Sequence, residues 1–212
     1  MLKSVSFTLI LIFLFSCSNK KEQKKLPYLG QVDVVFNEKT QKEDSVYPKI
    51  PDFSFLNHDS VWIYSKTKYQ NKIIVADFFF TSCPTICPKM TKQMKRLQKL
   101  TKHFENKIQF VSFTINPDFD KPSVLKNYRN KYTINAKNWD FLTGDEEETH
   151  QLGIEHFLIF AHKDIESEGG YAHSPAFVLI DKNKYVRGVY VGTDSNEVDK
   201  LNKDIQILLN NE

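Results

Sequence analysis

Residues 72–88 read KIIVADFFFTSCPTICP, and this stretch decides the fold. Six of its first nine residues are β-branched or aromatic, which is typical of a central strand buried on both faces of a sheet. Two cysteines, Cys83 and Cys87, follow directly. Pro84 suits the first turn of a helix, because its missing N–H would have no helical partner there. The stretch therefore predicts a buried strand that turns into a helix at the cysteines.

Strands and helices alternate on the C-terminal side of this stretch. Met90, Met94, Leu97 and Phe104 recur at helical spacing within 88–104, and lysines occupy the other positions of that helix. Further expected elements are a buried strand at 108–115, helices at 122–131 and 146–153, a hairpin of strands 177–180 and 185–191, and an amphipathic helix at 196–209. The order β-α-β-α-β-β-α predicts an α/β thioredoxin-like fold, a central mixed sheet flanked by helices.

The spacing of the two cysteines indicates metal or redox chemistry. Residues four apart lie on one face of a helix, so both sulfurs would share its first turn. A helix N-terminus lowers the pKa of a thiol, and paired thiolates suit a soft ion such as Cu(I). The same sulfurs could also close a disulfide. A purely structural disulfide is the weaker interpretation, since a strand-to-helix corner flanked by prolines is an unusual place for one.

Several separated motifs resemble the Sco/SenC family of copper proteins. The segment FTSCPTICP at 80–88 fits that family's F-T-x-C-P-x-x-C-P, and PDFSF at 51–55 fits its opening strand. NPDFDKP at 116–122 is similar to its D-P-x-x-D-[ST]-P turn, and LTG at 142–144 fits the segment before its next helix. His173, ahead of a strand at 176–181, fits the family's metal-binding histidine. The resemblance covers about residues 50–212.

The resemblance implies that Cys83, Cys87 and His173 bind copper. It also implies delivery of copper to the binuclear copper centre of cytochrome c oxidase, or maintenance of the cysteines of that centre in reduced form. Residue order alone supports part of this, because the loop before Ser174-Pro175 lies against the cysteine pair in a thioredoxin fold. His162 is a further possible ligand. Apart from that alternative for His162, all the other histidines are expected at the surface: His58, His103, His150, His156 and His162.

Three residues extend or qualify the resemblance. Asn116 stands where the family turn has Asp, and Asp118 or Asp120 could compensate. Asp77, six residues before Cys83, matches the buried Asp of thioredoxins and could shuttle a proton, although a plain hydrogen bond to a neighbouring hydroxyl is an equal alternative. Pro175 matches their cis-proline.

The N-terminus predicts attachment to a membrane. Residues 1–16 have a basic start and an apolar run too short to span a bilayer, as in a signal peptide. Cys17 then resembles the lipid-carrying cysteine of a bacterial lipobox. Residues 17–48 are expected to form a polar tether, with one edge strand near 32–36, and residues 49–212 the Sco-like domain. The chain is thus expected outside the cytoplasm as a lipoprotein, its partner the copper-receiving subunit of a respiratory oxidase or another copper protein.

Composition excludes some classes and leaves others open. The net charge of +3 over 212 residues and the absence of a Gly-rich phosphate motif argue against nucleic-acid and nucleotide binding. The main alternative to copper delivery is a membrane-tethered thiol-disulfide oxidoreductase that reduces a partner's cysteines. A copper sensor or scavenger would use the same ligands. A peroxiredoxin is disfavoured, because Phe80 and Pro84 occupy the positions where its motif needs Thr or Ser.

Overall fold

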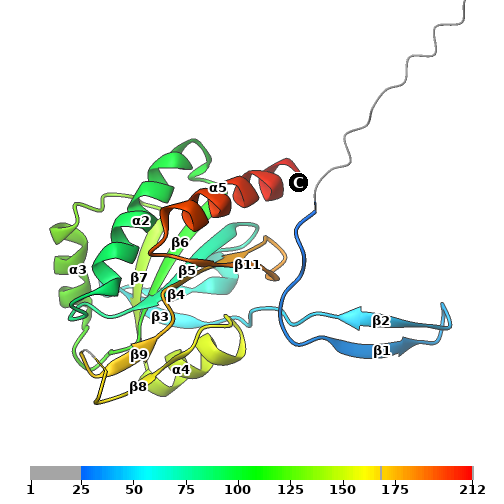
Figure 1. Ribbon diagram of the computed structural model, residues 1–212, viewed down its shortest axis with the longest axis horizontal. Helices are drawn as coiled ribbons and strands as arrows, with labels where there is room; N and C mark the ends of the chain where they lie inside the picture. Colours follow the sequence, from blue (N-terminus) through cyan, green and yellow to red (C-terminus); the bar gives the residue numbers. More distant parts are fainter. Residues whose placement is uncertain (1–24, 168, 212) are drawn as a thin grey trace, which may run out of the picture.

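A computed structural model describes residues 25–167 and 169–211, and its centre is a seven-stranded mixed sheet (Figure 1). The strand order is β11-β10-β5-β6-β7-β3-β4. The bounds are β3 Ser54–Asn57, β4 Trp62–Tyr64, β5 Ile73–Phe79, β6 Ile108–Thr114, β7 Trp139–Thr143, β10 Ala176–Ile180 and β11 Val186–Val191. Among the described residues, no helix is both long and apolar enough to cross a membrane.

The three middle strands run parallel, and this puts their carboxyl ends at one edge. Ile73 pairs with Ile108 across β5 and β6, and Phe110 pairs with Trp139 across β6 and β7. All residues of these strands are buried, as expected for strands covered on both faces. β3 and β10 pair antiparallel on either side of the three. The predicted mixed sheet flanked by helices is thereby confirmed.

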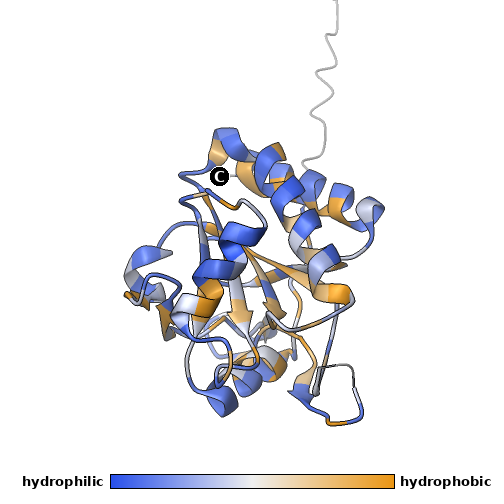
Figure 2. Ribbon diagram, turned by 90° about the vertical axis from the view of Figure 1, so that its left-hand side faces the viewer, coloured by the Kyte–Doolittle hydropathy of each residue, from blue (hydrophilic) through white to orange (hydrophobic). Residues whose placement is uncertain are grey.

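Helices cover both faces of the sheet. α2 (Ile86–Leu100), α3 (Pro122–Lys131) and α5 (Ser195–Asn210) cover one face, where Phe79 of β5 packs on Tyr128 of α3. α4 (Glu146–Glu155) covers the other face, where a Cβ at Gly153 would lie 3.1 Å from the ring of Phe78. Figure 2 shows the sheet largely in hydrophobic colours and the helices with hydrophilic outer sides. α1 (Ser65–Lys68) and a 3-10 turn (Lys102–Phe104) complete the helices of the described ranges.

Most predicted elements are confirmed to within two residues, but several elements were not foreseen. α3 has its expected bounds, and Met90, Met94 and Leu97 are buried as predicted. The cysteine helix begins at Ile86 rather than near Pro84 or at Pro88. The sequence pattern missed β7, because its residues WDFLT combine one acidic residue with a short run. It also missed the two-stranded sheet of β8 (Ala161–Lys163) and β9 (Tyr171–His173).

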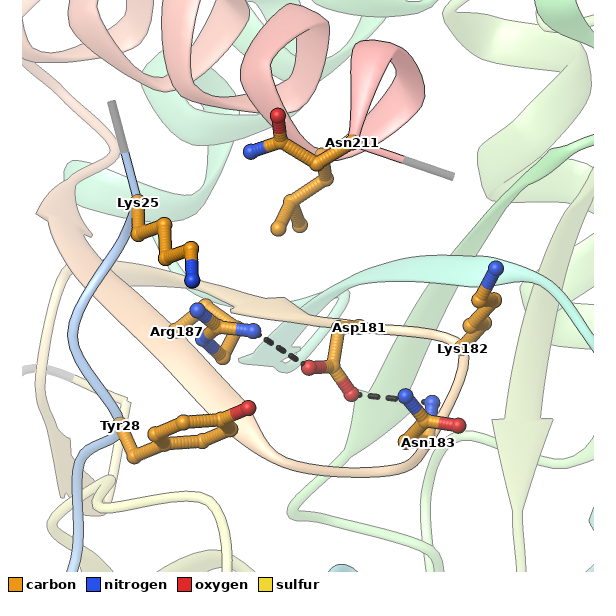
Figure 3. A pocket seen from close by; sticks show the side chains of 8 residues that line it. Lys25, Tyr28, Asp181, Lys182, Asn183, Arg187 and Asn211 are labelled. Carbon is orange, nitrogen blue, oxygen red and sulfur yellow. Dashed lines mark hydrogen bonds and ion pairs between the residues drawn. The ribbon is translucent and has the colours of Figure 1, made fainter. Parts of the chain in front are cut away.

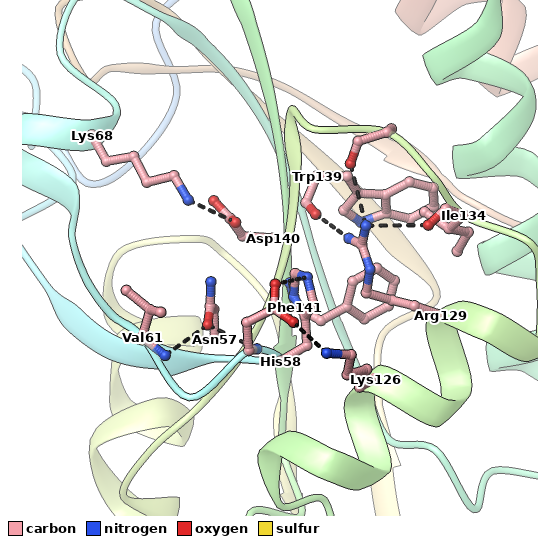
Figure 4. Close-up of polar contacts among 12 residues, drawn as sticks. Asn57, His58, Val61, Lys68, Lys126, Arg129, Ile134, Trp139, Asp140 and Phe141 are labelled. Atoms are coloured by element: carbon pink, nitrogen blue, oxygen red, sulfur yellow. Dashed lines mark hydrogen bonds and ion pairs between the residues drawn. The ribbon is translucent and has the colours of Figure 1, made fainter.

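Buried polar contacts fasten β7 and the loop before it (Figure 4). Asp140 accepts hydrogen bonds from Lys68 Nζ and the Tyr69 hydroxyl, both at 2.8 Å. Arg129 directs its guanidinium at the backbone carbonyls of Ile134, Ala136 and Trp139. A buried charge needs such partners, since unpaired burial costs several kcal/mol. These contacts explain how a short strand containing an aspartate occupies the sheet interior.

Part of the segment that the sequence assigns to a tether packs on the domain. Leu26 is buried, and the backbone N–H of Leu29 donates to Val186 O of β11 at 2.9 Å. Arg187 donates to the carbonyls of Leu26 and Pro27 and to Asp181, and its guanidinium lies 4.1 Å from the ring centroid of Tyr28 (Figure 3).

Residues 33–46 form a hairpin instead of an edge of the main sheet. β1 (Asp33–Asn37) pairs with β2 (Lys42–Val46), and the hairpin projects from the domain (Figure 1). The edge strand expected at 32–36 is therefore present as a strand, but it belongs to a separate two-stranded sheet. The signal peptide, Cys17 and the first part of the tether lie outside the described residues.

Candidate metal centre

The cysteine pair lies at the carboxyl end of β5, where the chain turns into α2. The Cys83 N–H donates to Phe80 O at 3.3 Å, which closes a turn directly after the strand. Cys87 is in the first turn of α2, and its backbone N–H points at Cys83 Sγ at 3.5 Å. Both thiols are free, and Cys87 is completely buried. The prediction that both cysteines lie in the first turn of one helix is wrong for Cys83, which lies in the loop three residues before α2, although its sulfur lies 3.5 Å from the backbone N of Cys87.

His173 completes the cluster from a different part of the chain. It ends β9, and its Nε2 lies 3.3 Å from Cys87 Sγ, while its Nδ1 lies 3.2 Å from the carbonyl of Ser174. The ligand atoms of Cys83, Cys87 and His173 all lie within 4.8 Å of one another. A single ion with bonds of about 2.0–2.3 Å spans at most about 4.6 Å, so it can reach three atoms so placed after side-chain shifts of a few tenths of an ångström. Within the part of the chain that the structure describes, these three residues are the cluster of His, Cys, Asp or Glu side chains that could hold a metal ion.

The histidine side of the cluster is held by aromatic packing and by one hydroxyl. The Phe80 ring contacts both Tyr171 and His173, with centroids 5.5 and 5.8 Å away. Tyr171 donates from its hydroxyl to Asn116 Oδ1 and Glu146 Oε2, each at 3.3 Å. Tyr171 and His173 are two apart on β9, so their side chains share a face. Neither Tyr171 nor Glu146 carries a sequence signal, because only the fold brings them together.

The two cysteines differ in acidity. A hydrogen bond from the Cys87 side chain, helped by bonds from His173 and from backbone N–H groups, lowers the pKa of Cys83 despite its burial. Burial raises the pKa of Cys87, and the neighbouring Cys83 raises it further. Cys83 is therefore the thiolate of the pair at neutral pH. Cys87 must lose a proton before its sulfur can bind a metal ion or attack Cys83.

Asp77 lies inside β5, close enough to influence the cluster. It is buried, and burial raises its pKa to about 7, while the hydrogen bond from Ser112 partly opposes the shift. Ser112 Oγ donates to Asp77 Oδ1 at 2.6 Å and accepts from the indole N–H of Trp139 at 2.9 Å. The hydrogen bond to a neighbouring hydroxyl and the raised pKa are thus both present. A carboxyl group that titrates near neutrality beside a dithiol suits proton transfer.

The cis-proline expectation is wrong. No peptide bond between described residues is cis, so the Ser174–Pro175 bond is trans. Two backbone hydrogen bonds hold the chain on either side of this peptide bond. The Ser174 N–H donates to Phe160 O at 2.8 Å, and the Gly192 N–H donates to Pro175 O. His173 lies next to the cysteines with this peptide bond in the trans form.

Other histidines depart from expectation. His162 pairs with Ala172 and not with His173 across the β8–β9 sheet, so its side chain faces away from the cluster. The suggestion of His162 as a ligand is therefore wrong. His58 and His150 are buried rather than at the surface: burial lowers the pKa of His58 to about 4, and the ring of His150 lies 2.9 Å from Ile115 O.

The turn that begins with Asn116 is hydrogen-bonded to the loop that carries Cys83. Asp120 is completely buried and accepts hydrogen bonds from the Thr81 N–H at 3.0 Å, the Thr81 hydroxyl and the Thr114 hydroxyl. Asp118 is exposed and lies 3.7 Å from Lys121. Asp120 thus holds the residue two positions before Cys83.

A hollow of about 250 Å³ opens onto the cluster. Its lining includes Cys83, Tyr171 and His173 together with Thr85 and Ile86 at the start of α2. The most acidic thiol therefore faces an accessible space, whereas Cys87 lies behind it. Fold and site together define a thioredoxin-like protein with a Cys-Cys-His cluster that can bind a metal ion.

Comparisons with known proteins agree with this class. The SCO1/SenC family model matches residues 41–210, and the chain belongs to that family. A SCO1/SenC family lipoprotein from Bacillus anthracis str. Ames is 35% identical, with a TM-score of 0.70 over 76% of this chain and 95% of that one. BsSco, described as having a disulfide switch and as a member of the Sco family of cytochrome c oxidase assembly proteins, is 29% identical, with a TM-score of 0.67 over 77% and 95%.

A more distant solved structure shares the fold. ScoI of Bradyrhizobium japonicum, solved with copper bound, is 17% identical, with a TM-score of 0.61 over 74% of this chain and 99% of that one. At this identity the likeness concerns the fold alone.

Proposed function

We propose that this protein is a membrane-anchored copper chaperone that binds copper through Cys83, Cys87 and His173 and serves assembly of the binuclear copper centre of cytochrome c oxidase. The observation that carries the proposal is the convergence of two sulfurs and one imidazole within 4.8 Å at the edge of the sheet. Two thiolates and a neutral imidazole form a soft donor set that suits copper. Membership of the Sco family supports the oxidase as the destination.

The geometry suits a cargo ion rather than a permanent one. The cluster opens to a hollow on the side of Cys83 and His173, so an acceptor's ligands can approach there. Cys83 provides a ready thiolate, and Cys87 releases a proton when the ion binds. Metal affinity should therefore rise with pH, because ligands must be deprotonated.

Membrane attachment is supported by sequence and by a relative. Cys17 follows an apolar run at the N-terminus, as the lipid-carrying cysteine of a bacterial lipobox does. The similar Bacillus anthracis protein is described as a lipoprotein. A lipid on Cys17 would keep the domain outside the cytoplasm, next to membrane-bound partners.

A second function, thiol-disulfide exchange with a partner, is favoured by the buried carboxyl of Asp77. The Cys83 thiolate attacks one sulfur of a partner disulfide, which forms a mixed disulfide and releases one partner thiolate. Asp77 takes the proton of Cys87, whose thiolate then attacks Cys83 Sγ. This closes the Cys83–Cys87 disulfide and releases the second partner thiolate, so the partner gains two electrons and this protein loses two.

The two functions separate in one experiment on the reduced protein. We would titrate it without oxygen with Cu(I) and then Cu(II), against competing chelators, with His173→Ala in parallel. Copper delivery predicts tight binding of one ion that weakens in the variant, while the Cys83–Cys87 disulfide still forms. Unchanged copper affinity in His173→Ala would remove His173 from the site, and copper retained after the disulfide forms would refute the cysteine site.

A further inference from the structure

The two ends of the central sheet differ in their balance of charge. The cysteine end is where the parallel strands finish, and the opposite end is where β5, β6 and β7 begin. Seven residues of β5 separate these ends by about 20 Å. Carboxylates outnumber lysines at the cysteine end. Lys89, Lys121 and Lys163 lie there, whereas the first turn of α4, the neighbouring loops and the start of α5 carry Asp118, Asp145, Glu146, Glu147, Glu148, Asp164, Glu166 and Asp194.

Lysines gather at the opposite end, and we call them the basic face. They come from positions just before the three parallel strands, from the end of α2, from the β10–β11 turn and from the N-terminal segment: Lys25, Lys72, Lys99, Lys102, Lys107, Lys137 and Lys182. All are exposed except Lys72, which is half-buried. One hollow of about 400 Å³ at this end is lined by Lys99, Lys102 and Lys137.

The acidic residues of this end are largely neutralised. Asp181 is buried and accepts from Arg187 Nη1 at 2.7 Å, and Asp52 accepts from Lys184 Nζ at 2.5 Å. Glu105 is exposed among the lysines of the hollow. The β1–β2 hairpin, a separate projection, carries carboxylates of its own and is not part of the basic face. The surface that remains around the starts of the strands is positive.

The chain enters the domain at this same end. Arg187 fixes residues 26–28 against the start of β11, and Lys25, Tyr28 and Asn211 line one hollow together (Figure 3). Figure 1 shows this segment and the end of α5 on one side of the domain and the β8–β9 sheet on the other. Whatever holds residues 1–24 therefore pulls on the basic face and not on the cysteine end.

We propose that the basic face docks on an anionic phospholipid surface and turns the cysteine end away from the membrane. The proposal rests on the membrane attachment proposed above for the direction of the chain, and on charge complementarity for the contact itself. Each lysine near an anionic surface strengthens binding roughly fivefold, so several can hold a domain that a lipid already keeps close. The acidic cysteine end is repelled by the same surface, which leaves the metal cluster open to a partner.

The test is a lysine footprint of the full-length protein. The chain is mixed with vesicles of phosphatidylcholine alone, or with added phosphatidylglycerol, and each lysine's reaction with an acylating reagent is followed by mass spectrometry. We expect Lys72, Lys107 and Lys137 to react about fivefold more slowly on the anionic vesicles. Lys89 and Lys163, near the cysteine end, should react equally on both. The protection should disappear at about 0.5 M salt.

A matched pair of double variants checks the cause. Lys107→Glu with Lys137→Glu should abolish the protection of Lys72, whereas Lys89→Glu with Lys163→Glu should leave it unchanged. Equal footprints on both vesicles overturn the proposal and leave the basic face to an acidic protein. A chain that stays in solution with phosphatidylcholine contradicts the lipid anchor, and the footprint on anionic vesicles then tests the basic face independently.

Discussion

The cysteine half and the histidine half of the cluster are built differently. Cys83 lies in a loop directly after the central strand, which the buried carboxylate of Asp120 fastens through Thr81, and Cys87 lies in the first turn of α2. His173 belongs to a two-stranded sheet outside the central one. Its place depends on the Phe80 ring and on the hydroxyl of Tyr171.

This difference separates what the sulfurs do from what the imidazole adds. A disulfide needs only the cysteine half, whereas a three-ligand metal site needs both halves in register. Changes in the histidine half should therefore alter metal binding and spare thiol chemistry. Changes in the cysteine half should disturb both.

The largest effect is expected from Cys87→Ala. It removes a soft ligand and one sulfur of the disulfide, so Cu(I) affinity should fall at least about 1,000-fold and the disulfide should not form. Chelator competition and thiol counting measure the two losses. Cu(I) binding of near wild-type strength would mean that the cysteine half is not the metal site.

A smaller effect on the same half is expected from Asp77→Asn, and it depends on pH. Burial raises the pKa of Asp77 to about 7, above the value near 4 of an unfolded aspartate. The folded state then binds the proton more tightly, so this site's stability contribution is full below pH 4 and is lost as the pH rises toward 7. In the reduced protein, Asp77→Asn should be more stable than wild type by roughly 3–4 kcal/mol at pH 8 and about equal at pH 4.

Denaturant unfolding at the two pH values measures this difference. Asp118→Asn is the matched control, because the side chain of Asp118 is exposed and should give no such dependence. A stability difference for Asp77→Asn that is the same at both pH values would show that Asp77 does not titrate between them.

His173→Ala removes the imidazole from the histidine half of the cluster. Loss of one imidazole ligand should weaken copper binding by at least about 100-fold, more than the loss of a residue that only holds a ligand, with a changed Cu(II) electron paramagnetic resonance spectrum. The reduction potential of the Cys83–Cys87 pair should move little, because both sulfurs remain. A large shift of that potential would show that the halves are not separable.

The smallest effect is expected from Tyr171→Phe, which removes only the hydroxyl that holds β9 to Asn116 and Glu146. One hydrogen bond contributes about 0.5–1.5 kcal/mol, so copper affinity should fall roughly two- to tenfold. The Cu(II) spectrum should broaden toward that of His173→Ala, which a loss of general stability would not produce. Tyr185→Phe, near the opposite end of the sheet, is the control. An unchanged spectrum for Tyr171→Phe would contradict a positioning role.

Local sequence predicted the cysteine half well and the histidine half poorly. The run 72–80 has one interpretation, a buried strand, and the cysteine spacing indicated two neighbouring sulfurs, although only Cys87 belongs to the helix. β8 and β9 have three residues each, too few for a period to show. The trans geometry of Pro175 also departs from the fold analogy, because a resemblance carries over residue types more safely than backbone states.

The sequence by itself determined the α/β class, the cysteine pair and, through the Sco-like motifs, His173 as the third member of the cluster. Only the tertiary structure decided that His162 faces away, that Tyr171 and Asn116 hold β9, and that scattered lysines form one face where the chain enters the domain. The physical reason is distance along the chain. Periodicity and spacing report on neighbours within a turn or a strand, whereas these contacts join segments that only the packed sheet brings together.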